Sequence, residues 1–220
     1  MTPDAPLPVA VPVFPLTGAL LLPRGTLPLN IFEPRYLAMV RDAMAATGAA
    51  NRMIGIVQPR SGGEPPPLYD VGCIGRIGDY RETDDGRILI ALTGVSRFRI
   101  AAELDRTTLY RQVMADYHDF PEDREDPDPL TAAARAGLED VLRVYLDAQG
   151  LSADWEAVRA ADDEALVTTL SGVCPFDPAE KQALLEAEDL PERAATLTAL
   201  MAFAQGLGGG GRGGDRPTMQ

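Results

Sequence analysis

The sequence predicts an α+β fold, in which a curved β-sheet or small barrel with one helix is followed by an all-helical bundle. Short apolar runs bounded by proline or glycine fill residues 1–120, and a single helical pattern interrupts them. After the acidic, proline-bearing segment PEDREDPDP, apolar residues recur at helical spacing as far as residue 206. The net charge of −13 changes at the same place, because residues 1–120 have a balance of −1 and residues 121–220 have a balance of −12.

The expected strands are short. Three of them, at 9–14, 19–22 and 27–32, are bounded by proline, which suits strand ends, edges or bulges. Further strands are expected at 53–57, 71–81, 87–92, 95–102 and 109–120. Asp84-Asp85-Gly86 is a hairpin turn signal, and the glycines within 71–81 indicate bulges or tight curvature. The stretch PRSGGEPPP, residues 59–67, is expected to be a semi-stiff surface loop.

The joint Phe32-Glu33-Pro34 separates a strand from the helix expected at 34–47. Pro34 suits the first helical position, and Glu33 is favourable beside the positive end of the helix. We expect Arg35 to pair with a carboxylate such as Glu33 and Tyr36 to pack under the sheet. The expected apolar face of this helix comprises Tyr36, Leu37, Val40 and Met44.

The acidic half is expected to contain a series of capped helices. They are predicted at 131–148, around Trp155 and Val158, at 165–173, at 178–188 and at 192–205, with Gly150 as a stop and Asp177 and Glu180 as a capping pair. The predicted domains are therefore a β-rich part, 1–120, a helical part, 121–206, and a flexible glycine-rich tail, 207–220.

Composition excludes several functional classes. A net charge of −13 argues against nucleic acid and anionic membrane surfaces as partners, because both are bound by clustered Lys and Arg. Cys73 and Cys174 stand far apart and the chain has one histidine, so neither a zinc site nor any cofactor is expected. A disulfide between the two cysteines stays open, but two buried free thiols are favoured. The start of the chain resembles no signal peptide, which favours the cytoplasm.

Catalytic groups are scarce. His118 and Asp119 are neighbours at an expected strand end, and Ser61 lies in a Gly/Pro loop without a second histidine to support it. Lys181 is the single lysine and falls in a helical pattern that predicts a solvent-facing residue rather than a general base. The sequence therefore predicts that the chain is not an enzyme.

Four blocks in the first half together resemble the Lon protease amino-terminal (substrate-binding) domain family, which has a PUA-like fold. They are VPVFPLTGALLLPRGTLPLNIFEPRY (11–36), RMIGIVQP (52–59), LYDVGCIGRIGDY (68–80) and DDGRILIALTGVSRFRI (84–100). A helical bundle after the β-rich part also fits this family. The ATPase and peptidase domains of bacterial Lon have no counterpart in these 220 residues, so the resemblance implies a stand-alone recognition role in the bacterial cytoplasm, related to proteolysis.

Two functions stay open at this point. The resemblance implies a polypeptide-binding or adaptor module, whose partner is an unfolded polypeptide or another protein. The alternative is an RNA- or small-ligand-binding module, since PUA-like folds also bind RNA. The candidate binding surface comprises Arg35, Tyr36, Arg76, Arg97 and Arg99. Arg76, Arg81, Arg87, Arg97 and Arg99 form a basic face unless they pair with acids such as Asp79, Glu82 and Asp84. Neither the oligomeric state nor the partner's identity follows from the sequence.

Overall fold

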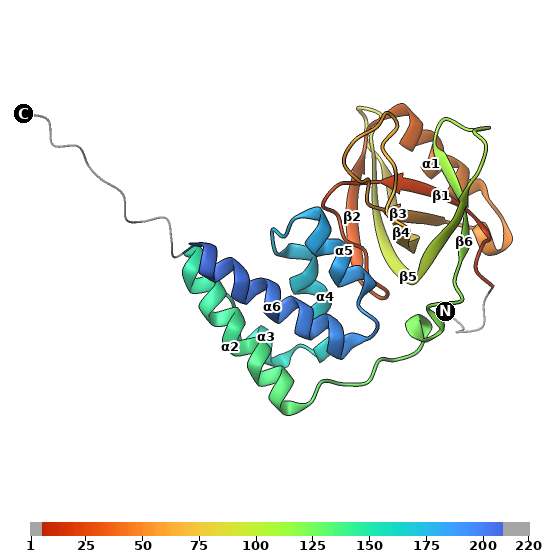
Figure 1. Ribbon diagram of the computed structural model, residues 1–220. Coiled ribbons are helices and arrows are strands. Elements are labelled where there is room, and N and C mark those ends of the chain that lie inside the picture. The colour runs from red at the N-terminus through yellow and green to blue at the C-terminus, as the bar shows by residue number, and fades with distance from the viewer. Residues whose placement is uncertain (1–5, 209–220) are drawn as a thin grey trace, which may run out of the picture. The chain divides into compact units, whose positions relative to one another are not determined.

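The computed structural model describes residues 6–208, with side chains as far as residue 204. These residues form two compact units (Figure 1). The first unit holds the chain up to Pro127 together with Gly172–Glu186, and the second holds Asp128–Ser171 and the chain from Ala187 onward. The predicted tail, 207–220, falls almost entirely outside the described residues. The predicted domains 1–120 and 121–206 stay a prediction, to which the structure adds that 172–186 belongs with the β-rich unit.

The first unit is built on a six-stranded sheet in the order β2-β5-β4-β3-β1-β6. Its strands are β1 (Ala10–Pro15), β2 (Thr26–Ile31), β3 (Met53–Val57), β4 (Val71–Glu82), β5 (Ile88–Glu103) and β6 (Arg111–Asp116). All neighbours are antiparallel except β1 and β3. The first part of β5 pairs with β2 and its last part pairs with β6, so the sheet closes on itself (Figure 1). The predicted α+β class with a curved sheet is confirmed.

Phe98 lies at the centre of the core that this sheet encloses, and its side chain is completely buried. It packs with Val11, Val13, Met53, Val57, Ile74, Val95, Val113 and Ala115. Gly72 on β4 makes room for the ring, because a Cβ there would lie 2.9 Å from the Phe98 Cζ atom and 2.7 Å from the Ile56 carbonyl oxygen. The small residues within the fourth strand are therefore a packing requirement of the curved sheet.

The strands predicted at 87–92 and 95–102 are a single strand, β5. Ile74 pairs with Ser96 and Gly75 pairs with Gly94, so Val95 is an extra residue on β5. Such a bulge bends a strand and increases its twist without ending it. The prediction of a break at Thr93-Gly94 was wrong because a bulge and a turn share the same glycine signal.

The strand predicted at 109–120 is also shorter than expected. The β6 strand covers only Arg111–Asp116, and the short 3₁₀ helix η2 (Pro121–Arg124) follows after a turn. The prediction counted Tyr110 and Phe120 as apolar strand residues, but both lie beyond the ladder that β6 forms with β1 and β5.

The strand predicted at 19–22 is absent, because these residues form a loop that packs directly onto β5. Leu20, Leu21 and Leu22 are all buried, although a half-buried strand would alternate. The Arg24 N–H donates to the Gly94 carbonyl oxygen (2.9 Å), and the Gly94 N–H donates to the Gly25 carbonyl oxygen (2.8 Å). A Cβ on Gly94 would lie only 2.0 Å from the Leu22 carbonyl oxygen, so this approach requires glycine.

We expect Gly94→Ala to lower the free energy of unfolding by about 2 kcal/mol or more, because the added methyl group meets backbone that must shift. Gly78→Ala is the matched control, since its Cβ would lie 3.8 Å from the nearest atom outside its chain neighbours, the Ala91 carbonyl oxygen. Urea denaturation followed by circular dichroism measures both variants. Equal midpoints for the two would contradict the close packing of the loop on β5.

Helix α1 (Pro34–Ala45) and the short η1 (Gly48–Ala50) connect β2 to β3. The buried residues of α1 are Tyr36, Met39, Val40 and Ala43, whereas Leu37 and Met44 are half-buried. The predicted apolar face is thus confirmed at Tyr36 and Val40 and is turned slightly toward Met39 and Ala43.

The second unit consists of helices α2 (Ala132–Gln149), α3 (Trp155–Ala160), most of α4 (Asp163–Val173) and α6 (Leu190–Gly208). Gly150 ends α2 in the left-handed conformation, as predicted, and Asp154 caps α3 by accepting from the N–H groups of Glu156 and Ala157. The Arg135 guanidinium on α2 contacts the Asp163 carboxylate (2.7 Å) and the Val158 carbonyl oxygen (2.6 Å), which joins three helices. No helix within residues 6–208 is long and apolar enough to cross a membrane.

Helix α5 (Pro178–Glu186) packs against the sheet. It begins with the predicted capping pair, in which the N–H of Asp177 donates to Glu180 and the N–H of Glu180 donates to Asp177, both at 2.8 Å. The amide of Gln182 donates to the Val71 carbonyl oxygen (3.0 Å), and the amide of Gln58 donates to the Pro178 carbonyl oxygen (2.8 Å). Two glutamine side chains therefore satisfy backbone groups between the helix and the sheet.

Candidate functional site

The stretch Phe32-Glu33-Pro34-Arg35-Tyr36 is a structural joint, as predicted. Glu33 is the residue before the helix, in extended conformation, and its carbonyl oxygen accepts the N–H groups of Tyr36 and Leu37, each at 2.9 Å. Pro34 occupies the first helical position, where its missing N–H costs nothing. Arg35 forms the predicted ion pair with Glu33 (2.8 Å), and its guanidinium lies over the Tyr36 ring at 4.6 Å.

Tyr36 is buried, as predicted, with 5% of its surface exposed. Its ring packs on Phe14 of β1 with a centroid distance of 3.9 Å. Burial raises the pKa of the Tyr36 hydroxyl above its usual value. Phe32, by contrast, is 65% exposed and contributes an apolar side chain to the surface next to this joint.

We expect Tyr36→Ala to lower the free energy of unfolding by about 3 kcal/mol or more, because it leaves a cavity beside Phe14. Tyr36→Phe keeps the ring and is the matched control, with an expected change below about 1 kcal/mol. Thermal and urea denaturation of both variants measure the effect. A near-neutral Tyr36→Ala variant would show that the ring does not support α1.

The predicted basic face does not form. Arg97 is buried with 5% exposure, and Arg76 is half-buried and donates to the Asn51 carbonyl oxygen (3.0 Å). Arg99 is exposed and pairs with Asp119 (2.8 Å), and Arg87 pairs with Asp85 (2.8 Å). The acids that bind Arg87 and Arg99 are Asp85 and Asp119 rather than the expected Asp79, Glu82 and Asp84. Pairing with acids was the alternative to an RNA-binding face that the sequence left open. The structure therefore gives no support to RNA binding.

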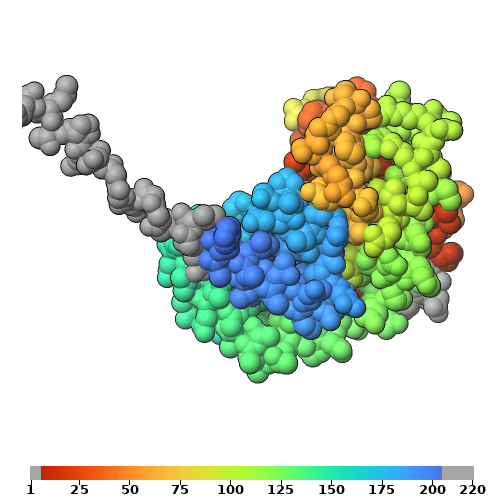
Figure 2. Space-filling view, viewed as in Figure 1, coloured from red at the N-terminus to blue at the C-terminus, as the bar shows by residue number. Residues whose placement is uncertain are grey.

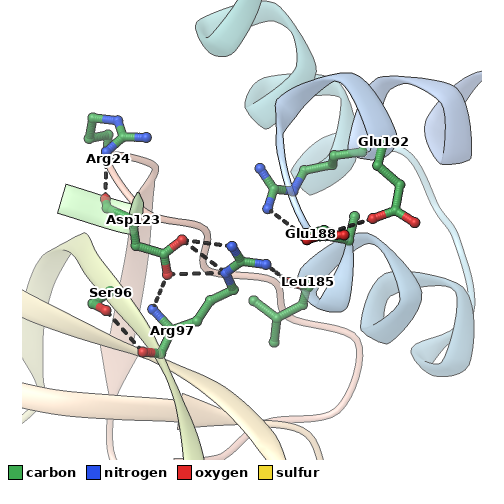
Figure 3. A network of polar contacts seen from close by, with 9 residues as sticks. Arg24, Ser96, Arg97, Asp123, Leu185, Glu188 and Glu192 are labelled. Carbon is green, nitrogen blue, oxygen red and sulfur yellow. Dashed lines mark hydrogen bonds and ion pairs between the residues drawn. The ribbon is translucent and has the colours of Figure 1, made fainter. Parts of the chain in front are cut away.

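Arg97 is a structural residue that joins three chain segments (Figure 3). Its guanidinium contacts both carboxylate oxygens of Asp123 in η2, at 2.7 to 3.0 Å, and its backbone N–H donates to the same carboxylate at 2.6 Å. A third contact runs from the guanidinium to the Leu185 carbonyl oxygen of α5 (3.3 Å). Arg24 in turn donates to the Asp123 carbonyl oxygen (2.6 Å). The alternating pattern of β5 did not indicate that Arg97 is buried, because the acid that compensates its charge, Asp123, lies outside the sheet.

We expect Asp123→Ala to lower the free energy of unfolding by roughly 3 to 5 kcal/mol, because it leaves the Arg97 charge buried without its partner. Asp119→Ala removes the partner of an exposed arginine on the same strand and should cost about 0 to 1 kcal/mol. Urea denaturation of the two variants gives the difference. If Asp123→Ala is no less stable than Asp119→Ala, water reaches Arg97 and the pair is not a buried one.

A cavity of about 250 Å³ lies in the first unit, beside the joint at Arg35 and Tyr36. Three segments form it: the joint with β1, the loop 59–67, and the chain that leads into β6. Its lining residues are Pro15, Arg35, Tyr36, Pro59, Glu64, Pro65, Pro66, Arg106, Leu109, Tyr110 and Arg111. We call it the Arg106 pocket. Figure 2 shows the loop 59–67, in orange, on the surface of the unit.

Hydrogen bonds hold the walls of the Arg106 pocket in place. Arg111 donates to the Pro66 carbonyl oxygen (2.7 Å) and forms a two-point ion pair with Glu103 (2.6 and 2.7 Å). The hydrogen bonds from Arg111 hold the pKa of the Glu103 carboxyl below its usual value. The Tyr110 hydroxyl donates to Asp42 of α1 (2.8 Å), which joins the third segment to the helix. The loop 59–67 is closed by the Arg60 N–H, which donates to the Pro67 carbonyl oxygen (2.7 Å).

Binding is the chemistry that this lining supports. The described residues that line the pocket include no His, Cys, Ser or Asp. Its polar groups are three guanidinium groups, one carboxylate and two phenols, which can orient a ligand. No group of three or more His, Cys, Asp or Glu side chains in the described part of the chain could hold a metal ion.

Of the predicted site residues, the structure brings only Arg35 and Tyr36 to this pocket. Sequence reasoning missed Arg106, Leu109 and Arg111. Leu109 and Arg111 lay within the strand predicted at 109–120, and Arg106 stands in an ordinary polar stretch. The sequence signal for this site was Leu109, an apolar residue directly after the polar stretch 105–108. In the structure Leu109 is 70% exposed, so it does not belong to the core.

Lys181 does not face solvent, and that prediction was wrong. Its side chain is buried, with 7% of the residue exposed, and its ammonium group donates to the Gly172 carbonyl oxygen (3.0 Å). Burial lowers the pKa of Lys181. Cys73 and Cys174 are both buried and are not joined in a disulfide, as expected.

Comparison with solved structures supports the fold. A crystal structure of a Lon N-terminal domain protein from Xanthomonas campestris matches with a TM-score of 0.63 and 22% identity, over 86% of this chain and 97% of that one. The N-terminal domain of Mycobacterium avium complex Lon protease matches with a TM-score of 0.62 and 21% identity, over 88% of this chain and 98% of that one.

Comparison of sequences identifies the family. Lon protease 2 of Sorangium cellulosum is 26% identical over 210 residues, which are 91% of this chain and 25% of the relative. Lon protease of Escherichia coli K12 is 25% identical over 208 residues, 91% of this chain and 26% of the relative. The chain thus spans about a quarter of the length of these relatives. The family model of the ATP-dependent protease La (LON) substrate-binding domain matches residues 10–202, and the chain therefore belongs to this family.

Proposed function

We propose that this chain is a non-enzymatic polypeptide-binding or adaptor module, which recognises exposed apolar segments of unfolded chains or of a protein partner. The observation that carries the proposal is membership of a family of substrate-binding domains over residues 10–202. A location in the bacterial cytoplasm is part of the same proposal.

The surface of the first unit supports this function. Leu109 lines the Arg106 pocket and is 70% exposed, so its side chain can contact an apolar segment that enters the pocket. Phe32, at the joint before α1, is 65% exposed. The described residues that line the cavity include no His, Cys, Ser or Asp, the residue types most often used for nucleophilic or acid–base catalysis. Of the five arginines of the predicted basic face, Arg76, Arg87, Arg97 and Arg99 are instead paired with acids or with backbone.

The test is binding of a permanently unfolded polypeptide. Reduced, carbamidomethylated α-lactalbumin, labelled with fluorescein, is titrated with the full chain and followed by fluorescence anisotropy. We expect a dissociation constant of about 1 to 100 μM, equivalent to about 5 to 8 kcal/mol, because recognition of disordered segments pays for their ordering.

The native, disulfide-intact form of the same polypeptide is the control, and we expect it to bind at least tenfold more weakly. If the unfolded form does not bind below 100 μM, or if both forms bind equally, the proposed function is wrong.

A further inference from the structure

We propose that the Arg106 pocket selects polypeptide segments in which an apolar or aromatic side chain stands beside a carboxylate. This inference rests on the proposed function and adds the chemical class of the segment that is bound. It is based on two parts of the pocket lining: an apolar wall, and three guanidinium groups that differ in how many ion pairs and hydrogen bonds they already make.

The apolar wall suits a single side chain. Rigid rings form this wall, namely those of Pro15, Pro65, Pro66 and Tyr36. Leu109 also lines the pocket and is 70% exposed. The volume of about 250 Å³ is below the range of about 300 to 1,000 Å³ that is typical of sites for drug-sized ligands. It therefore suits one side chain of a longer segment rather than a cofactor.

Guanidinium groups outnumber carboxylates among the lining residues, although the whole chain has a net charge of −13. Three arginines line the pocket, Arg35, Arg106 and Arg111, with the acid Glu64, while Glu33 and Glu103 outside the lining pair with Arg35 and Arg111. A guanidinium without an ion-pair partner favours an anionic group of the ligand by direct attraction, and the acidic remainder of the surface disfavours non-specific binding of acidic chains.

The three arginines differ in how firmly they are engaged. Arg111 is firmly engaged, because its side chain is 11% exposed and its guanidinium binds both Glu103 and the Pro66 carbonyl oxygen. Arg35 pairs with Glu33, but the side chains are 55% and 43% exposed, and such a pair is worth only about 0 to 1 kcal/mol. Arg106 is exposed and makes no ion pair or hydrogen bond with any residue in the described range 6–208.

Arg106 is therefore the group that binds the carboxylate. A guanidinium can donate two parallel hydrogen bonds to a carboxylate, and such charge-assisted pairs are stronger than neutral ones. Arg35 can add a second contact at small cost by releasing Glu33. The carboxylate can belong to an Asp or Glu side chain or to the carboxyl end of a chain, and the two sources are separated by the probes below.

The experiment uses fluorescein-labelled ten-residue peptides in a Gly/Ser background, titrated with the full chain by fluorescence anisotropy. Three amidated peptides carry Phe-Glu, Phe-Gln or Ala-Glu at the centre, and a fourth ends in Phe with a free carboxyl group. We expect Phe-Glu to bind at least fivefold tighter than both Phe-Gln and Ala-Glu. A fourth peptide that binds like Phe-Glu identifies a chain end as an equal source of the carboxylate, and one that binds like Phe-Gln restricts the source to side chains.

Variants then assign the selectivity to single residues. Arg106→Gln should remove the difference between Phe-Glu and Phe-Gln, and Leu109→Ser should reduce the difference between Phe-Glu and Ala-Glu. Arg81→Gln is the matched control, since it removes the same charge from an exposed position of β4 outside the pocket. It should leave both differences within twofold, and equal melting temperatures confirm that all variants fold.

The inference is overturned if Phe-Gln binds as tightly as Phe-Glu, or if Arg81→Gln abolishes the selectivity as well as Arg106→Gln does. In either case, retained binding of unfolded α-lactalbumin leaves the proposed function standing. Loss of binding to the unfolded polypeptide and to all four peptides overturns both.

Discussion

The buried ion pair between Arg97 and Asp123 is the constraint that holds the first unit together. Arg97 belongs to the long strand β5, Asp123 to the 3₁₀ helix that follows the sheet, and the third partner, the Leu185 carbonyl oxygen, to α5. Desolvation makes such a pair a weak source of net stability, but an unpaired charge at this place is very costly. The pair therefore acts as a condition on the fold: all three segments must be in place before Arg97 can be buried.

Asp123 also binds the loop that contains Leu20–Arg24 and packs on β5. Arg24 donates to the carbonyl oxygen of Asp123, and the neighbouring backbone of Arg24 and Gly25 exchanges hydrogen bonds with Gly94. The loop can approach this closely only because residue 94 has no side chain. Two features that are far apart in the sequence, a glycine at a bulge and an acid after the last strand, thus fix one loop between them.

The features that the sequence predicted correctly are local ones. The joint at Glu33-Pro34 and the capping pair Asp177–Glu180 depend on residues within one helical turn, so their spacing is visible in the chain. The features that it missed are made by distant segments. Arg97 looked like a surface residue because Asp123 lies 26 positions away, and the Arg106 pocket needs three segments that only the closed sheet brings together. Leu20, Leu21 and Leu22 were predicted as a strand because a short continuous apolar run is also typical of a buried strand. Their burial comes from packing on the bulge of β5, which the run itself does not indicate.

Arginines in this unit have two different physical roles, and their burial separates them. Arg97 is engaged on every side by β5, η2 and α5, so its charge is part of the folded state and is not available to a ligand. Arg35 and Arg106 stand in water, where an ion pair gains little and can be exchanged. Arg111 lies between these cases: it holds the loop 59–67 to the chain that enters β6, and so keeps the pocket walls in place. A rigid frame around exchangeable cations is what selective but reversible binding of a polypeptide segment requires, since ordering is then needed only in the ligand.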